Sequence, residues 1–287
     1  MTEPAGEPAG PVCYRHPDRV TYIHCGHCDR PICTECMIPA PVGFQCPECV
    51  AAAEPARLDT AVGAPVISRP YLTYGLIGLN VAIFLLQLSV GVDESAASWG
   101  MWPIGIAANG EYWSLLSSAF LHGSVLHIAF NMYVLFVMGP TLERVLGHAR
   151  FAVLYLLAAF GGAVASYLFS DLNTVSVGAS GAIFGLMGAF VVAGRRLRYD
   201  ITQVLVLLAI NLAFGFIQPN VDWRAHLGGL VVGALVAAIF VFAPRRHQLL
   251  LQSIGCLGLL AVLVIATVVR TAQIQDLLTP FVPGLQT

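Results

Sequence analysis

From Tyr71 onward the sequence consists of apolar runs, each about long enough to cross a lipid bilayer. A transmembrane helix needs about 20 mostly apolar residues. The chain has 57% hydrophobic and only 10% charged residues, which is unusual for a soluble domain. We expect seven transmembrane helices, at residues 71–90, 122–140, 151–170, 179–194, 201–218, 226–243 and 249–269. The fold class predicted from these runs is an all-α polytopic membrane protein.

The arginines between these runs predict how the helices cross the membrane. All 14 basic residues are arginine, a bias typical of a GC-rich bacterial coding sequence. Seven of the 14 lie in the connections between runs two and three, four and five, and six and seven: Arg144, Arg150, Arg195, Arg196, Arg198, Arg245 and Arg246. Because basic loops stay in the cytoplasm, we expect a cytoplasmic N-terminus and an outer C-terminus, in the plasma membrane of a bacterium.

Residues 1–50 are a segment of another kind, because they carry seven of the eight cysteines. With one histidine these cysteines form four ligand pairs: Cys13 and His16, Cys25 and Cys28, Cys33 and Cys36, and Cys46 and Cys49. Eight such ligands would fill two tetrahedral Zn²⁺ sites. Pairs one and three are 16 residues apart and pairs two and four 17, whereas pairs two and three are 4 apart. We therefore predict a cytoplasmic module in which the pairs interleave to form two structural zinc sites.

The cysteine-rich segment has alternative interpretations. A disulfide framework is the alternative to zinc, but cytoplasmic thiols stay reduced. His24 and His27 lie beside the ligand pairs, which leaves individual ligands open. The pattern resembles a B-box-like zinc finger, although that family usually closes its last pair with histidines. Residues 1–70 carry five Arg against eight Asp and Glu, so we expect a cytoplasmic protein partner and no nucleic acid. Residues 51–70, rich in Ala and Pro, are expected to be a linker.

Polar residues within the apolar runs indicate where chemistry takes place. The second run begins with His122, His127 and Asn131, the fourth with Ser180 and the sixth with His226. In the predicted topology these three helices run from outside to inside, so all five side chains lie in the outer half of the membrane. Polar side chains at that depth are costly and usually functional. Packing alone would explain one serine, but not five polar residues at one depth.

A serine and a histidine at one depth suggest nucleophilic catalysis. Serine becomes a good nucleophile when a base accepts its proton, and His226 suits that task. The side chains of His127 and Asn131 and the backbone N–H of Ser180 are candidate donors to an oxyanion. Glycines on the fourth and sixth helices, including Gly181, would let these helices approach closely. We expect no catalytic role for Asp222, the only acid near His226, and no metal in the catalysis.

These motifs resemble the rhomboid family of intramembrane serine proteases. The family's serine motif resembles Gly178-Ala179-Ser180-Gly181, and its sixth-helix motif resembles Ala225-His226-Leu227-Gly228-Gly229. Its two histidines and asparagine match His122, His127 and Asn131, and its Glu-Arg pair matches Glu143-Arg144. The resemblance implies a six-helix catalytic core over 71–245 with a Ser180–His226 dyad, His127 and Asn131 in the oxyanion hole, and cleavage of transmembrane substrates near the outer face. Residues 246–287 would add a seventh helix and an outer tail.

The sequence departs from the family at two positions. Ser114 follows Trp113 where many members have arginine, and Phe184 stands where tyrosine is common. A metalloprotease would need a His-Glu-x-x-His helix, and an aspartyl protease two membrane aspartates; neither occurs here. A rhomboid-like protein that only binds membrane clients is the serious alternative, but such proteins typically lack the serine or the histidine. A transporter is less favoured, because no inverted repeat is recognisable.

Overall fold

The structure is a computed structural model that describes residues 10–52, 60, 62–64, 66–218 and 221–280. The chain divides into two compact units, Met1–Leu58 and Asp59–Thr287. The first unit corresponds to the cysteine-rich segment, and the second contains every helix that was expected to cross the membrane.

The N-terminal unit has little regular secondary structure. Strand β1 (Ile38–Pro39) pairs antiparallel with β2 (Phe44–Gln45), and the short helix α1 (Pro47–Ala52) follows. Gly43 lies in the turn between the strands at φ +71°, a conformation that favours glycine. The buried core consists of cysteine side chains and Ile32. So small an apolar core does not offset the conformational entropy that folding costs, and another source of stability is needed.

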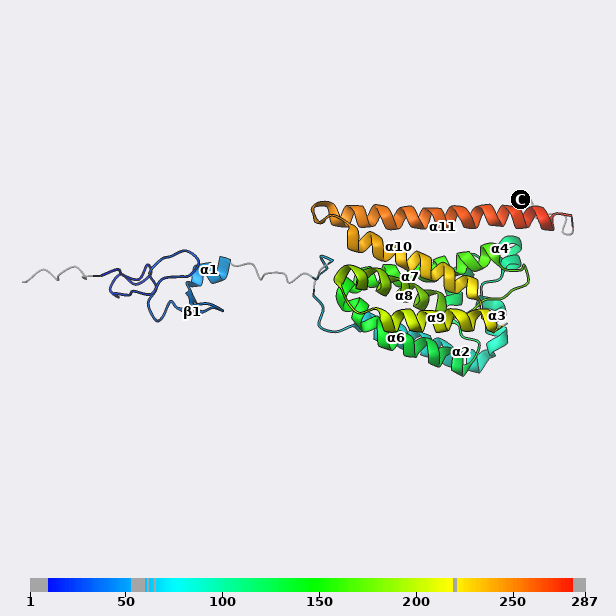
Figure 1. Ribbon diagram of the computed structural model, residues 1–287, viewed down its shortest axis with the longest axis horizontal. Coiled ribbons are helices and arrows are strands. Elements are labelled where there is room, and N and C mark those ends of the chain that lie inside the picture. Colours follow the sequence, from blue (N-terminus) through cyan, green and yellow to red (C-terminus); the bar gives the residue numbers. More distant parts are fainter. Residues whose placement is uncertain (1–9, 53–59, 61, 65, 219–220, 281–287) are drawn as a thin grey trace, which may run out of the picture. The chain divides into compact units, whose positions relative to one another are not determined.

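The second unit is a helical bundle that confirms the all-α polytopic prediction. In the described part of the chain, six helices are long and apolar enough to cross a membrane. The remaining expected span, the fifth along the chain, is α9, an apolar helix of 16 residues that is shorter than the others. The helices run along one common direction (Figure 1): α2 (Tyr71–Val90), α6 (Val125–Leu146), α7 (His148–Phe169), α8 (Ser180–Leu197), α9 (Thr202–Ile217), α10 (Trp223–Phe242) and α11 (Gln248–Leu278).

Capping residues explain where several of these helices begin. The Ser124 hydroxyl accepts the N–H of His127 in the first turn of α6, and the Asp222 carboxylate accepts two N–H groups of α10. First-turn N–H groups have no partner within the helix, so such caps are stabilising. Gly147, at φ +77°, separates α6 from α7 in a backbone conformation that other residues rarely adopt.

Helix α2 is capped by a residue from another helix. Glu143, fully buried near the C-terminal end of α6, accepts the N–H of Leu72 at 3.0 Å and the N–H and hydroxyl of Thr73 at 2.8 and 2.6 Å. A negative charge at a helix N-terminus also interacts favourably with the helix dipole. The imidazole of His148, at the start of α7, pairs with the same carboxylate. One buried acid therefore joins three helices.

The connection between α2 and α6 is a series of short helices rather than an extended loop. It contains α3 (Val92–Trp99), α4 (Pro103–Asn109), α5 (Ser114–Ser117) and the 3₁₀ helix η1 (Ser118–Phe120). Exposed aromatic side chains, Trp99 and Trp113 among them, project from this segment. Tryptophan is enriched at the boundary between a membrane and water, an environment that suits these exposed aromatic side chains.

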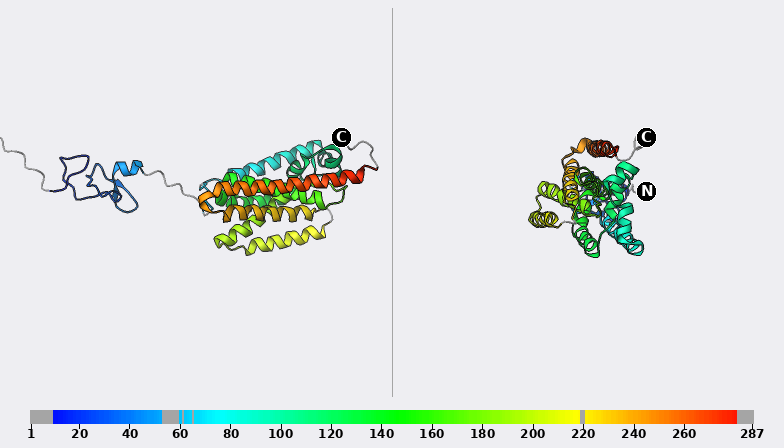
Figure 2. Two further views of the ribbon diagram at one scale, coloured as in Figure 1. Left: turned by 90° about the horizontal axis from the view of Figure 1, so that it is seen from above. Right: turned by 90° about the vertical axis from the view of Figure 1, so that its right-hand side faces the viewer.

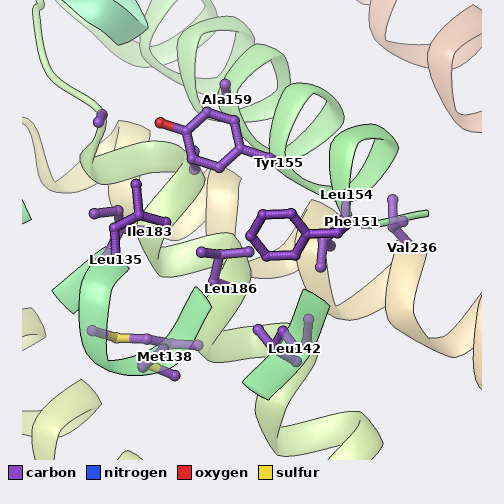
Figure 3. Close-up of a cluster of buried hydrophobic side chains, with 14 of the residues drawn as sticks. Leu135, Met138, Leu142, Phe151, Leu154, Tyr155, Ala159, Ile183, Leu186 and Val236 are labelled. Carbon is purple, nitrogen blue, oxygen red and sulfur yellow. The ribbon is translucent and has the colours of Figure 1, made fainter. Parts of the chain in front are cut away.

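The apolar core lies between α6, α7, α8 and α10. Figure 3 shows side chains from all four helices converging on one another, with the rings of Phe151 and Tyr155 among them. Leu135 and Leu186 are fully buried in the same cluster. Within a membrane, close packing of such side chains against one another holds the helices at fixed positions.

Glycines bring α8 and α10 into direct backbone contact. A Cβ atom added to Gly233 would overlap the backbone of Gly185, and one added to Gly229 would overlap the backbone of Gly181. Helix α7 joins the contact, because a Cβ on Gly162 would lie 2.8 Å from a carbonyl oxygen of α10. Small residues allow this close approach. The first turns of α8 and α10, which carry Ser180 and His226, are thereby held together.

Helix α11 lies on the outside of the bundle, as does α9 (Figure 2). It has 31 residues and continues beyond the predicted end of the seventh span. Near its start the Gln248 amide donates to the carbonyl of Val62 at 2.7 Å. Near its end the Gln275 amide donates to the carbonyl of Ala107 in α4 at 2.8 Å. Hydrogen bonds thus fasten the helix to the second unit at both ends.

Part of the segment 51–70, expected to be a linker, packs on the bundle. Val62 and Ala64 are buried, and the Thr60 hydroxyl donates to the carbonyl of Val145 in α6 at 2.8 Å. Residues 53–59, 61 and 65 of the expected linker lie outside the described residues. The part of the segment nearest to α2 is therefore a component of the membrane unit.

Candidate active site and metal sites

Ser180 is the first residue of α8, and the backbone before it has a conformation that favours glycine. Gly178 adopts φ +136°, and its N–H donates to the carbonyl of Ser118 in η1 at 2.9 Å. A Cβ on this glycine would lie 2.7 Å from the ring of His127 and 3.6 Å from the hydroxyl oxygen of Ser180. Glycine is therefore needed at position 178 for both backbone conformation and space, and its neighbours on either side are the predicted nucleophile and an oxyanion donor.

His226 lies in the first turn of α10 and is 8% exposed. Its imidazole stacks on the ring of Phe184, with centroids 4.1 Å apart and planes inclined by 11°. Since Phe184 is one turn after Ser180, the stack places the imidazole over the first turn of the serine's helix. A Cβ on Gly215 of α9 would lie 3.3 Å from His226 Nδ1, which has no hydrogen-bond partner among the described residues. Nδ1 therefore faces α9, and Nε2 is the nitrogen left to serve as a base.

His127 has a defined tautomer when its ring is neutral. Its Nδ1 accepts the N–H of Gly123 at 3.4 Å, so the proton resides on Nε2, the atom beside Gly178. Asn131 follows one turn later, is 6% exposed and donates through its amide to the carbonyl of His127 at 2.9 Å. One further amide N–H of Asn131 is not used in that bond. The structure thus brings the predicted His127 next to the predicted Ser180, and Asn131 one turn below.

Gln87 is a site component that the sequence analysis did not identify. It lies in α2, is 2% exposed and makes two hydrogen bonds with the backbone of His122, which is fully buried. Its amide oxygen accepts the N–H at 2.9 Å, and its amide nitrogen donates to the carbonyl at 3.4 Å. The next residue, Gly123, supplies the N–H that orients His127. A single glutamine in an otherwise apolar run was the available signal.

Asp222 and Ser176 form a second feature that was missed. The Ser176 hydroxyl donates to one carboxylate oxygen of Asp222 at 2.7 Å, and the other oxygen caps α10. Asp222 therefore has a structural task close to His226, although no catalytic role was expected for it. The spacing of Asp222 and His226, four residues apart, was the only sequence signal.

The cysteine-rich unit contains two groups of side chains that could each hold a metal ion. One consists of Cys13, His16, Cys33 and Cys36, and the other of Cys25, Cys28, Cys46 and Cys49. Within each group the ligand atoms all lie within 4.8 Å of one another. The structure therefore brings together the first pair with the third and the second with the fourth, as the spacing predicted. His24 and His27 belong to neither group.

The chemistry of these groups calls for a cation. Burial, together with hydrogen bonds and negative charge from the adjacent Cys13 and Cys33, raises the pKa of the Cys36 thiol to about 11. Such crowded thiols do not all ionise unless a positive charge compensates them. Arg30 supplies part of this positive charge in the second group, because its Nε–H donates to Cys28 Sγ at 3.2 Å. Its terminal guanidinium nitrogen pairs with the Glu48 carboxylate at 2.7 Å. A bound divalent cation would supply the rest.

Comparison with known proteins places the membrane unit in a family. The Rhomboid domain family model matches residues 109–244. "Rhomboid protease GluP" of Bacillus subtilis is 39% identical over 178 residues, 59% of this chain and 35% of GluP. "RHOMBOID-like protein 4" of Arabidopsis thaliana is 38% identical over 148 residues, 49% of this chain and 37% of that protein. The chain thus spans little more than a third of the length of these two relatives.

A further relative is matched over most of its length. The rhomboid-family protein YdcA of Bacillus subtilis is 38% identical over 145 residues, which are 49% of this chain and 73% of YdcA. Relatives occur in plants as well as in bacteria, so these matches do not indicate the source of the chain. The family and the described helices together make this a multi-pass membrane protein. The chain belongs to the rhomboid family.

Proposed function

We propose that this protein is an intramembrane serine endopeptidase in which Ser180 is the nucleophile and His226 the general base. The observation that carries the proposal is the stack of His226 on Phe184, which places the imidazole above the helical turn that begins with Ser180. The name of the bacterial relative GluP, a rhomboid protease, is consistent with it.

The geometry suggests a sequence of proton transfers. His226 Nε2 accepts the proton of the Ser180 hydroxyl as the oxygen attacks a peptide carbonyl, and then returns it to the leaving amine. A water molecule activated by the same imidazole hydrolyses the acyl-enzyme. The dyad needs no third acid, because stacking on Phe184 and contact with Gly215 already hold the ring.

The oxyanion that forms during attack needs donors already in place. His127 Nε2–H is available beside Gly178, and the backbone N–H of Ser180 lies at the positive end of α8. The second amide N–H of Asn131 completes the set. Such donors act more strongly in a site shielded from water than they would in solution.

Cleavage is proposed to occur near the outer face of the membrane. The arginines of the α6–α7, α8–α9 and α10–α11 connections lie at the opposite ends of the helices from Ser180 and His226. If these connections are cytoplasmic, as basic loops usually are, the dyad lies in the outer half and the N-terminus is inside. A substrate helix must unwind to expose a carbonyl, so helix-breaking Gly or Pro and small residues are expected at the cleaved bond.

The decisive experiment is cleavage of a single-pass transmembrane reporter by the purified protein in liposomes. Wild type is compared with Ser180→Ala, His226→Ala and, as a matched control, Ser89→Ala, whose exposed hydroxyl bonds only within its own helix. We expect wild type and Ser89→Ala to cleave near the outer end of the reporter helix and the dyad variants to be inactive. Equal cleavage by all four would contradict the proposal. Folded but inactive wild type would favour client binding without proteolysis.

We further propose that both groups in the cysteine-rich unit hold structural Zn²⁺, because thiolate and imidazole ligands in fours are its usual set. The unit is proposed to recruit a cytoplasmic protein partner or to regulate the protease, and the proton transfers above need no group from it. Removing residues 1–58 should therefore leave cleavage in liposomes intact and change activity only in cells. A truncated protein that is folded but inactive in liposomes would contradict this separation.

A further inference from the structure

One hydrogen bond joins the two backbone segments that carry the proposed dyad. Ser176 lies four residues before Ser180, and Asp222 lies four residues before His226. The Ser176 hydroxyl donates to Asp222 Oδ2 at 2.7 Å. Both side chains are partly buried. Because its acceptor is a carboxylate, this bond is of the stronger, charge-assisted kind. We refer to it as the Ser176–Asp222 bridge.

The Asp222 end of the bridge is fixed relative to the turn that carries His226. Asp222 Oδ1 accepts the backbone N–H groups of Arg224 at 3.2 Å and Ala225 at 3.3 Å. The backbone carbonyl of Asp222 accepts the N–H of His226 at 3.3 Å. The carboxylate is thus part of the N-terminal cap of α10, and it moves only if the first turn of α10 moves with it.

The Ser176 end is fixed relative to the segment between α2 and α6. Its backbone exchanges two hydrogen bonds with Met101, at 3.0 and 2.9 Å, and Met101 is fully buried. Two residues later, Gly178 donates to the carbonyl of Ser118 at 2.9 Å. The segment that leads into Ser180 is therefore held in place by backbone hydrogen bonds, and the bridge attaches α10 to it.

Helix packing and the stack of His226 on Phe184 hold the first turns of α8 and α10 together. At the closest approach of the two helices, around Gly181 and Gly229, no side chains interlock to fix the rotation of one helix on the other. We propose that the Ser176–Asp222 bridge sets the rotation and height of His226 relative to Ser180. This inference rests on the proposed protease function, and it makes Ser176 and Asp222 positioning residues.

Asp222 does not act as the third member of a catalytic triad in this arrangement. His226 Nδ1, the atom that such an acid would bond, faces Gly215 of α9. The carboxylate is already occupied by the Ser176 hydroxyl and two N–H groups of α10. Its effect on the reaction is therefore exerted through the position of α10.

A double-mutant cycle on the full-length protein tests the bridge. Asp222→Ser keeps an oxygen that can cap α10 but has none that reaches Ser176, and Ser176→Ala removes the donor. We expect each single variant to lower kcat about tenfold with KM unchanged, since a small displacement of reacting groups is costly. The double variant should be no slower than either single one. Independent, multiplicative losses, or a rise in KM with kcat retained, would overturn the proposal.

Matched variants separate positioning from general effects on folding. Ser176→Thr keeps the hydroxyl, and Asp222→Asn keeps both the cap and a group that bonds Ser176, so both should retain most of kcat. Asp200→Ser is the control for the cap, because Asp200 accepts the N–H of Thr202 at the start of α9 and bridges to nothing that bears on the dyad. It should leave kcat unchanged. Failure of the conservative variants to restore kcat would count against the bridge.

A measurement that does not depend on catalysis distinguishes failure of this inference from failure of the proposed function. The same cycle is followed by thermal unfolding in detergent, where a real bridge makes the effects of Ser176→Ala and Asp222→Ser less than additive. Wild type that cleaves no reporter but shows this coupling would overturn the protease function and leave the bridge standing. Additive shifts in the midpoint, with or without cleavage, would overturn the bridge.

Discussion

The two units of this protein are stabilised in opposite ways. In the N-terminal unit the buried side chains are mainly cysteines, which repel one another when ionised and for which we proposed bound Zn²⁺. In the membrane unit the buried side chains are mainly apolar, and α8 and α10 meet at glycines, where the absence of a side chain permits close contact. If the proposed zinc ions are bound, the stability of the first unit depends on a ligand, whereas that of the second depends on the shapes of its helices. The same kind of substitution should have very different consequences in the two units.

The largest expected effect is the loss of one metal ligand. Cys46→Ser should reduce the bound zinc from two ions to one and unfold the N-terminal unit, because structural zinc contributes on the order of 10 kcal/mol. Zinc content and the near-ultraviolet circular dichroism of the purified unit measure this. Reporter cleavage in liposomes should stay at the wild-type rate. The matched control is Cys256→Ser in α11, which belongs to neither ligand group and should leave the zinc content unchanged.

A shape-dependent unit should respond to the addition of a single methyl group. Gly233→Ala should destabilise the membrane unit by about 1–3 kcal/mol, since the new Cβ overlaps the backbone of Gly185. Thermal unfolding in detergent measures the loss. Gly258→Ala is the control, because a Cβ on that helical glycine meets nothing within 4 Å. Equal stability of the two variants would show that the close contact of α8 with α10 is not what holds the bundle.

The contrast also explains what could be predicted from the sequence. Metal ligands recur at fixed short spacings, so the pairing of Cys13 and His16 with the third ligand pair could be anticipated. Apolar runs reveal helices, and glycine spacing suggested that Ser180 and His226 would meet. The length of α9, only 16 residues, was not visible in hydropathy, which does not show where a helix ends.

Hydrogen bonds between distant segments were not predictable, because no local sequence pattern indicates which residues form them. Glu143 was noted only as part of a motif, yet it caps α2, which lies 70 residues earlier in the chain. Gln87 and Asp222 are single polar residues whose partners can be seen only after the helices are packed. Their roles follow from tertiary structure, whereas those of the zinc ligands follow from spacing alone.

An intermediate effect is expected where the membrane unit does depend on polar contacts. Gln87→Met keeps the approximate shape of the side chain but leaves the N–H and C=O of His122 without their partner. Two buried backbone groups without partners should cost about 2–4 kcal/mol, and kcat should fall because Gly123 no longer holds His127 in place. Kinetics and thermal unfolding measure the two effects. Asn211→Leu removes an amide that bonds only its own helix, so a similar loss there would contradict this role for Gln87.

The smallest effect should come from the segment that joins the two kinds of unit. Thr60→Val removes the hydroxyl that donates to Val145 and accepts the N–H of Ala64, so the membrane unit should lose about 1 kcal/mol. Zinc content should not change, because Thr60 belongs to the membrane unit. Hydrogen exchange of residues 60–64 measures the local loss directly. If instead the variant released zinc, the stabilities of the two units would be coupled through this segment. Zinc binding by the first unit and helix packing in the second would then not be independent of each other.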